Sequence, residues 1–220
     1  MVNETEIRET LVEYSREAVQ RGLSGGTAGN MSMRFGDRML ITPSGIAPDI
    51  MRPDQIAEVD FDGRFDGDWK PSSEWALHAK LYKTRPEAQA IVHAHPDYCV
   101  AISCMRQALP SFHYMVAAYG GNEVPCSPYR LFGSVDLADA VTQTMGERYT
   151  ACLIANHGMI AIGDTLRKAF TRTEGLETLA RQYYLARTMG EISLLDDTEM
   201  EEVHGAYKSY RYGEASRSAR

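Results

Sequence analysis

The segment AIVHAHPDYC, residues 90–99, begins as an apolar β-strand and carries His93 and His95 two positions apart. Because side chains alternate along a strand, the two imidazoles point to one face while their apolar neighbours point to the other and into a core. Pro96 ends the strand, and the polar residues at this end predict that the histidine pair lies near a rim rather than deep inside the protein. Two imidazoles on one face can bind one metal ion, and the alternative is a pair of structural histidines at a strand end.

A third histidine follows another apolar stretch, in IANHGMIAIG at residues 154–163. Gly158 comes directly after His157, and its lack of a Cβ permits a tight backbone turn and suits close approach to a site. Two histidines from one strand and one from another would supply three nitrogen ligands, the usual number for a catalytic zinc that keeps a coordination position open. The spacing alone also allows three unrelated histidines.

Two further segments have the composition of anion-binding sites. GGTAGN at 25–30 offers unobstructed backbone amides and the side chain of Asn30, although a flexible loop without a ligand has the same composition. PSSE at 71–74 places two serines at the predicted start of a helix, where free amides, hydroxyls and the helix dipole favour an anion or an ordinary cap. Its glutamate either complements the dipole or, beside a metal, binds the ion or carries a proton.

The whole chain of 220 residues is long enough for one well-buried core, and we expect one domain. Its formal charge of −7 disfavours a nucleic-acid partner, since no long basic stripe is present. No apolar run has the length of a membrane span or a signal-peptide core, so we expect a cytoplasmic protein without a membrane partner. The four cysteines lack C-x-x-C spacing, which predicts reduced, mostly buried thiols.

Hairpin and helix signals are mixed along the chain, which indicates an α/β or α+β class. Glycine and proline mark most of the boundaries between the expected elements. The expected helices span 3–22, 72–85, 136–147 and 164–190, and the expected strands lie within 22–35, 38–45, 56–65, 90–95 and 151–163.

Taken together, GTAGNMS, ITPSG, PSSEWALH, IVHAHPDYCVAIS, HYMVAAYGGNEVPCSPYRLFGS and NHG resemble, in order and spacing, the class II aldolase and adducin family. The resemblance covers about residues 5–210 and is strongest to the L-fuculose-1-phosphate aldolases. It implies a single α/β domain over 1–220, with a central, mostly antiparallel β-sheet flanked by helices and a mobile C-terminal tail from about 205. It also implies a homotetramer with active sites at subunit interfaces.

The resemblance also implies a role for each candidate site residue. His93, His95 and His157 would hold Zn²⁺, with Mn²⁺ or Co²⁺ as other possible ions. Glu74 would be a fourth ligand that substrate displaces and that then acts as general acid/base. Tyr114, from the neighbouring subunit, would protonate or orient the aldehyde oxygen, unless it serves only the interface. The implied phosphate site contains Thr27, Gly29, Asn30, Ser44, Gly45, Ser72 and Ser73, and the implied aldehyde pocket contains Phe132 and Tyr210.

The implied activity is zinc-dependent cleavage of a deoxy-ketose 1-phosphate to dihydroxyacetone phosphate and an aldehyde. L-Fuculose 1-phosphate, 5-deoxyribulose 1-phosphate and 5-methylthioribulose 1-phosphate are the candidate substrates. Asn156 stands where the fuculose enzymes have histidine, so the identity of the aldehyde stays open. The alternatives within the family are a ribulose-5-phosphate 4-epimerase, a sugar-acid-phosphate decarboxylase and, since all four expected metal ligands are present, less favourably a non-enzymatic adducin-like scaffold.

Overall fold

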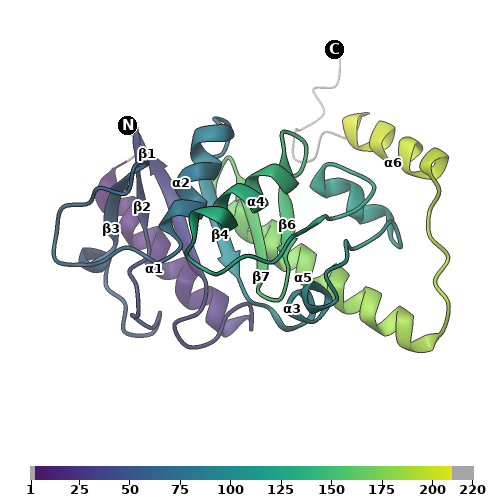
Figure 1. Ribbon diagram of the computed structural model, residues 1–220, viewed down its shortest axis with the longest axis horizontal. Coiled ribbons are helices and arrows are strands. Elements are labelled where there is room, and N and C mark those ends of the chain that lie inside the picture. Colours follow the sequence, from purple (N-terminus) through teal and green to yellow (C-terminus); the bar gives the residue numbers. More distant parts are fainter. Residues whose placement is uncertain (1–2, 210–220) are drawn as a thin grey trace, which may run out of the picture.

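A seven-stranded β-sheet runs through the computed structural model of the chain, which describes residues 3–209 (Figure 1). The strand order is β3-β2-β1-β4-β7-β6-β5, so β4, the strand that carries His93, lies in the middle. The strands are β1 (Asn30–Phe35), β2 (Arg38–Ile41), β3 (Ala57–Asp60), β4 (Ala90–Ala94), β5 (Cys126–Ser127), β6 (Ala151–Ile154) and β7 (Gly158–Gly163).

The predicted α/β class and mostly antiparallel sheet are confirmed. Five of the pairings are antiparallel, and the short pairing of β5 with β6 is parallel, which makes the sheet mixed. In the central ladder, His93 lies opposite Asn30 on one side and Ile160 on the other. The antiparallel turn between β6 and β7 therefore brings His157 to the end of β4.

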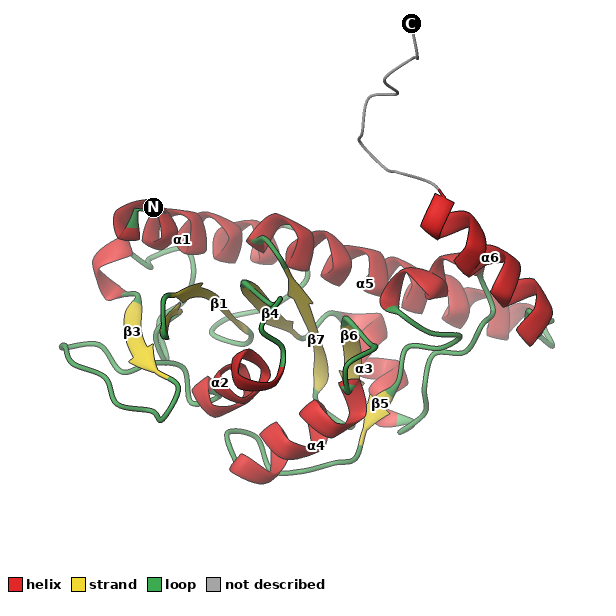
Figure 2. Ribbon diagram, turned by 90° about the horizontal axis from the view of Figure 1, so that it is seen from above, coloured by secondary structure: helices red, strands yellow, loops and turns green. Residues whose placement is uncertain are grey.

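Helices cover both faces of the sheet (Figure 2). On one face α1 and α5 pack on one hydrophobic cluster, and on the other face α2 and α4 pack on a second. Neighbouring residues Ile91 and Val92 belong to different clusters, as strand alternation requires. The helices are α1 (Glu4–Gln20), α2 (Trp75–Thr84), α3 (Asp97–Cys104), α4 (Val135–Met145), α5 (Leu166–Met189) and α6 (Asp197–Ser209).

The position of His93 differs from the expectation of a site at the rim of the sheet. Helix α2 packs on the face of β4 that carries this histidine, so His93 is completely buried. His95 follows the last residue of the strand and is only partly buried. Both faces of β4 thus belong to packed layers, and the site opens only beyond its C-terminal end.

Most predicted elements are present, and the differences lie at their ends. Asn3 caps α1 by accepting a hydrogen bond from the Thr5 amide. Helix α2 begins at Trp75, later than expected, so Glu74 occupies its N-cap position. Two helices, α3 and α6, were not predicted.

The expected C-terminal tail begins within α6, because the chain is helical as far as Ser209. Tyr210 and the rest of the tail lie outside the described residues. None of the helices within 3–209 combines the length and the apolar character needed to cross a membrane. All four cysteines are free thiols, and Cys99 and Cys152 are buried.

Candidate active site

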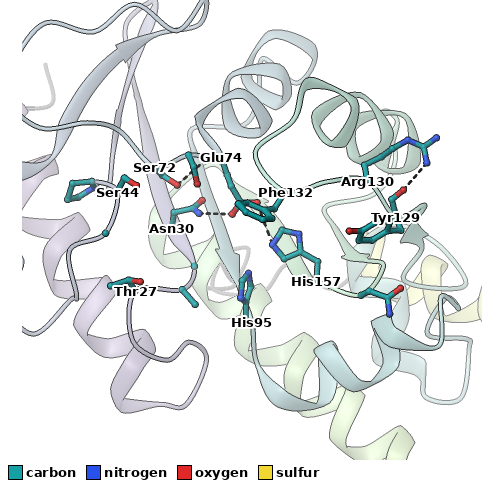
Figure 3. A pocket seen from close by; sticks show the side chains of 16 residues that line it. Thr27, Asn30, Ser44, Ser72, Glu74, His95, Tyr129, Arg130, Phe132 and His157 are labelled. Carbon is teal, nitrogen blue, oxygen red and sulfur yellow. Dashed lines mark hydrogen bonds and ion pairs between the residues drawn. The ribbon is translucent and has the colours of Figure 1, made fainter.

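Four potential metal ligands converge where the central strand ends. One ligand atom from each of Glu74, His93, His95 and His157 can be chosen so that all four lie within 4.8 Å of one another. Two come from β4 and the residue just after its end, one from the turn between β6 and β7, and the carboxylate from the start of α2. Three segments distant in sequence therefore build one cluster, as the resemblance implied. Figure 3 shows the side chains of Glu74, His95 and His157 around the opening.

Hydrogen bonding fixes which nitrogen of His93 is available. Its Nδ1 donates to the Met159 carbonyl at 2.8 Å, which leaves the lone pair of Nε2 facing the cluster. That Nε2 lies 2.9 Å from Glu74 Oε2 and 2.9 Å from His95 Nε2. Three atoms with lone pairs at such distances repel one another unless they share a proton or a cation. The donor set, three imidazoles and a carboxylate, therefore fits a divalent ion, and Zn²⁺ in particular.

Two polar atoms at this point have no hydrogen-bond partner among the described residues. They are Glu74 Oε1 and His157 Nδ1, and both are buried. Buried polar atoms are usually paired, so each such exception points to an interaction outside the protein atoms. A metal beside Glu74 would satisfy the carboxylate oxygen.

The charges of the cluster also suit a cation. Burial, followed by the charge of His93, lowers the pKa of His95 to about 3 and of His157 to about 4. Burial also disfavours the charged forms of His93 and Glu74, but the attraction between their opposite charges outweighs this effect. The attraction raises the pKa of His93 and holds the pKa of Glu74 far below its usual range. Two imidazoles are thus neutral, and the His93–Glu74 pair holds the one proton that a metal would replace.

Gly158 allows the His157 turn to approach the end of β4. A Cβ at this position would lie 2.5 Å from the Ala94 carbonyl oxygen and 2.7 Å from Cδ2 of His95. Both distances are shorter than van der Waals contact. The close approach of β7 to the histidine strand therefore depends on the missing side chain.

We expect Gly158→Ala to weaken Zn²⁺ binding by about 10-fold or more, because the added methyl must displace His95 or the turn that carries His157. The measurement is competition for Zn²⁺ with a chromogenic chelator. Gly205→Ala is the matched control, since a Cβ there meets nothing within 4 Å. Wild-type affinity in Gly158→Ala would show that the turn tolerates the methyl group.

The cluster opens into a cavity of about 420 Å³ (Figure 3). Glu74, His95 and His157 form part of its wall. The loop before β1, the loop after β2 and the segment before α2 form another part. The cavity thus unites three of the four candidate metal ligands with every residue predicted for the phosphate site: Thr27, Gly29, Asn30, Ser44, Gly45, Ser72 and Ser73.

The start of α2 is suited to an anion. No side chain caps this helix, although the amides of Trp75 and Leu77 bond to the carbonyls of Ser72 and Glu74, and the dipole of the helix favours an anion at this end. Ser72 is buried and its hydroxyl accepts a hydrogen bond from the Glu74 amide at 3.3 Å. Both serines lie before the helix rather than in its first turn, yet both line the cavity.

The side chain of Asn30 bonds to protein groups, whereas we expected it to bind a phosphate. Its Nδ2 donates to Glu74 Oε2 at 3.0 Å, and its Oδ1 faces His78 Nε2 at 2.6 Å. Both ends of the amide are therefore occupied by protein groups. Any contact of Asn30 with a phosphate stays a prediction.

The residues predicted for the aldehyde side are only partly brought together. Phe132 lines the cavity and is 64% exposed. Tyr114 does not line it in the isolated chain; its side chain is exposed and stacks on His113 with ring centres 4.8 Å apart. Tyr210 lies outside the described residues.

The sequence interpretation did not assign Tyr129 and Arg130 to the site, although both line the cavity, as do Ala28 and Pro43 within the quoted motifs. Tyr129 and Arg130 stand only a few positions before Phe132, which was assigned to the pocket, so adjacency was the available signal. Asn156, noted only as a departure from the fuculose enzymes, also lines the cavity. Its Oδ1 accepts a hydrogen bond from Arg106 at 2.7 Å, and the Arg106 guanidinium lies over the Tyr129 ring.

Comparison with known proteins agrees with this geometry. The family model described as the class II aldolase and adducin N-terminal domain matches residues 9–184. The chain belongs to this family. The match covers most of the chain and confirms the resemblance that the motifs indicated.

Individual relatives match nearly end to end. A 5-methylthioribulose-1-phosphate/5-deoxyribulose-1-phosphate aldolase of Rhodospirillum rubrum is 40% identical over 204 residues, 93% of this chain and 92% of that protein. An L-fuculose phosphate aldolase of Haemophilus influenzae is 40% identical over 210 residues, 95% of this chain and 97% of that protein. A solved L-fuculose 1-phosphate aldolase structure has a TM-score of 0.87 at 36% identity and covers 92% of this chain and 96% of its own.

Proposed function

We propose that this family member is a divalent-metal-dependent aldolase that cleaves a deoxy-ketose 1-phosphate to dihydroxyacetone phosphate and an aldehyde. The observation that carries the proposal is the cluster of three imidazoles and Glu74, of which Glu74, His95 and His157 line a cavity that is also lined by two loops and the uncapped start of α2. The names of the relatives support it, because both kinds act on ketose 1-phosphates.

His93, His95, His157 and Glu74 would hold the ion, which we propose to be Zn²⁺. When bound, the ion supplies a Lewis acid for the oxygens next to the bond that breaks. The loops and the serines before α2 bind the phosphate. This binding energy, remote from the reacting carbons, orients the ketose against the metal ligands.

The proposed role of Glu74 is proton transfer at carbon. In cleavage, the bond between the third and fourth carbons breaks, its electron pair passes to the third carbon, and the hydroxyl of the fourth carbon loses its proton as the aldehyde forms. The third carbon must then gain a proton, and in synthesis it must lose one. Glu74 borders the cavity, and its Oε1 accepts no hydrogen bond from the described residues and lies 3.5 Å from His157 Nε2, so it is placed to move this proton.

The aldehyde side requires a second proton donor or acceptor, and we propose Tyr114 of a neighbouring copy. Tyr114 and Met115 are both exposed in the isolated chain, which supports a subunit contact at this turn. We accordingly propose a homotetramer with active sites between subunits, working in the cytoplasm. Phe132 would face the aldehyde from the same chain.

The test is release of dihydroxyacetone phosphate, followed by coupled reduction, from fuculose 1-phosphate, 5-deoxyribulose 1-phosphate and 5-methylthioribulose 1-phosphate. We expect chelator-sensitive release from at least one of them, and the ratios of kcat/KM identify the preferred aldehyde. The same sugar without its phosphate serves as control and should react at least about 100-fold more slowly, because it lacks the remote binding energy. Zinc binding without release from any of the three sugars would contradict the aldolase proposal and favour epimerisation or decarboxylation.

A further inference from the structure

A chain of buried polar groups runs from Glu74 into the interior between β1 and α2. Asn30 bonds to Glu74 at 3.0 Å and to His78 at 2.6 Å. The other ring nitrogen of His78 lies 2.7 Å from the Ser32 hydroxyl, which lies 2.8 Å from the Tyr82 hydroxyl. Every member of this chain is buried, and His78 and Ser32 are completely so. Every contact is within hydrogen-bond distance.

The backbone geometry produces this arrangement directly. Asn30 and Ser32 are two positions apart on β1 and therefore share one face of the strand. His78 and Tyr82 are four positions apart on α2 and therefore share one side of the helix. The four side chains alternate between strand and helix along the contact of β1 with α2. The series of hydrogen bonds therefore follows from the packing of these two elements.

Only one direction of hydrogen bonding satisfies all the atoms. Glu74 Oε2 can only accept, so the amide nitrogen of Asn30 must face it and the amide oxygen must face His78. His78 Nε2 must then carry the proton, which leaves Nδ1 as an acceptor for the Ser32 hydroxyl. The Ser32 oxygen in turn accepts from the Tyr82 hydroxyl. Burial favours the neutral imidazole that this pattern needs and lowers the pKa of His78 to about 3.

We infer that His78 is a positioning residue for the reaction: through Asn30 it fixes the donor that holds the Glu74 carboxylate in place beside the metal ligands. The inference rests on the proposed function of Glu74. Without the ring of His78, the Asn30 amide can rotate and present its oxygen to the carboxylate. Glu74 then loses its oriented donor and is held less firmly, both as a ligand and as a proton carrier.

The test compares His78→Phe, which removes both ring nitrogens, with His78→Gln, whose amide can donate to Asn30 and accept from Ser32. We expect His78→Phe to lower Zn²⁺ affinity in chelator competition and kcat by about 10- to 100-fold each, with KM changed less than about threefold. His78→Gln should restore most of both losses. Thr173→Val is the control: like His78→Phe it removes a completely buried polar group, in this case a hydroxyl that bonds within α5 to the Ala169 carbonyl.

Folding is followed by circular dichroism and thermal unfolding for each variant. Should His78→Phe not fold, Ser32→Ala removes one link only and should lower Zn²⁺ affinity by about two- to tenfold. Loss of thermal stability with unchanged Zn²⁺ affinity and kcat, or equal losses in Thr173→Val, would overturn the inference. If the wild-type protein cleaves none of the three sugars but Zn²⁺ affinity still falls in His78→Phe and returns in His78→Gln, the positioning role stands and the aldolase proposal fails.

Discussion

Replacing Glu74 with glutamine is expected to lower kcat for sugar-phosphate cleavage by about 10²- to 10⁴-fold, the range for loss of a general acid/base. Glutamine keeps the size of the side chain and an oxygen that can accept from Asn30, but it cannot take up or release the proton at carbon. The loss should appear in kcat more than in KM, since the loops and serines that bind phosphate remain intact.

The decisive measurements for Glu74→Gln are kcat, KM and the zinc content of the purified protein. Three imidazole ligands remain, so the variant should still bind zinc under saturating conditions. Exchange of the carbon-bound proton of dihydroxyacetone phosphate with solvent deuterium, followed by NMR, should fall in parallel with kcat. Glu191→Gln, at an exposed position outside the cavity, serves as the control. A zinc-loaded Glu74→Gln protein with more than a tenth of wild-type kcat would remove Glu74 from the proton transfer.

The sequence predicts the cluster of three histidines and Glu74 because its members lie in short segments with recognisable local patterns. Alternation along β4 puts His93 and His95 on one face, and the glycine after His157 marks a close approach that the structure contains. The resemblance then joins these segments in space, which spacing alone could not do.

The sequence does not predict what depends on tertiary packing. His93 is completely buried because α2 covers its face of the sheet, and no local signal in β4 reports the position of that helix. The side chain of Asn30 resembled a phosphate ligand, yet its partners Glu74 and His78 stand 44 and 48 positions away. Only the fold of β1 against α2 decides which groups this amide meets.

The two unpredicted helices show a related limit. Helix α3 begins directly after Pro96, which had been interpreted as the end of a strand only. Pro96 occupies the N-cap position of α3 with an extended backbone, two residues after Ala94, the last residue of β4. His95 therefore lies between the end of the strand and the start of the helix, in the wall of the cavity.

Removal of the metal is expected to abolish cleavage, with a fall of at least about 10³-fold, because no other group in the cluster can replace a Lewis acid worth several kcal/mol in the transition state. Dialysis against a chelator, followed by titration with Zn²⁺, Mn²⁺ or Co²⁺, should restore the rate at one ion per subunit. His93→Ala should fail to recover at the same concentrations, because the loss of a ligand also leaves Glu74 without its nearest partner. His204→Gln is the control, since His204 bonds to Asn122 away from the cavity.

The same titration repeated at several pH values tests the charge state of the cluster. The pKa of His93 is raised, so below it this ring holds a proton that must leave before a metal can bind. His95 and His157 have lowered pKa values of about 3 and about 4 and are already neutral. One proton should therefore be released for each ion bound, and apparent Zn²⁺ affinity should fall about tenfold for each pH unit below the pKa of His93. Release of two or three protons at pH 6 would show that the other two rings are charged, and affinity independent of pH would show that His93 is not a ligand.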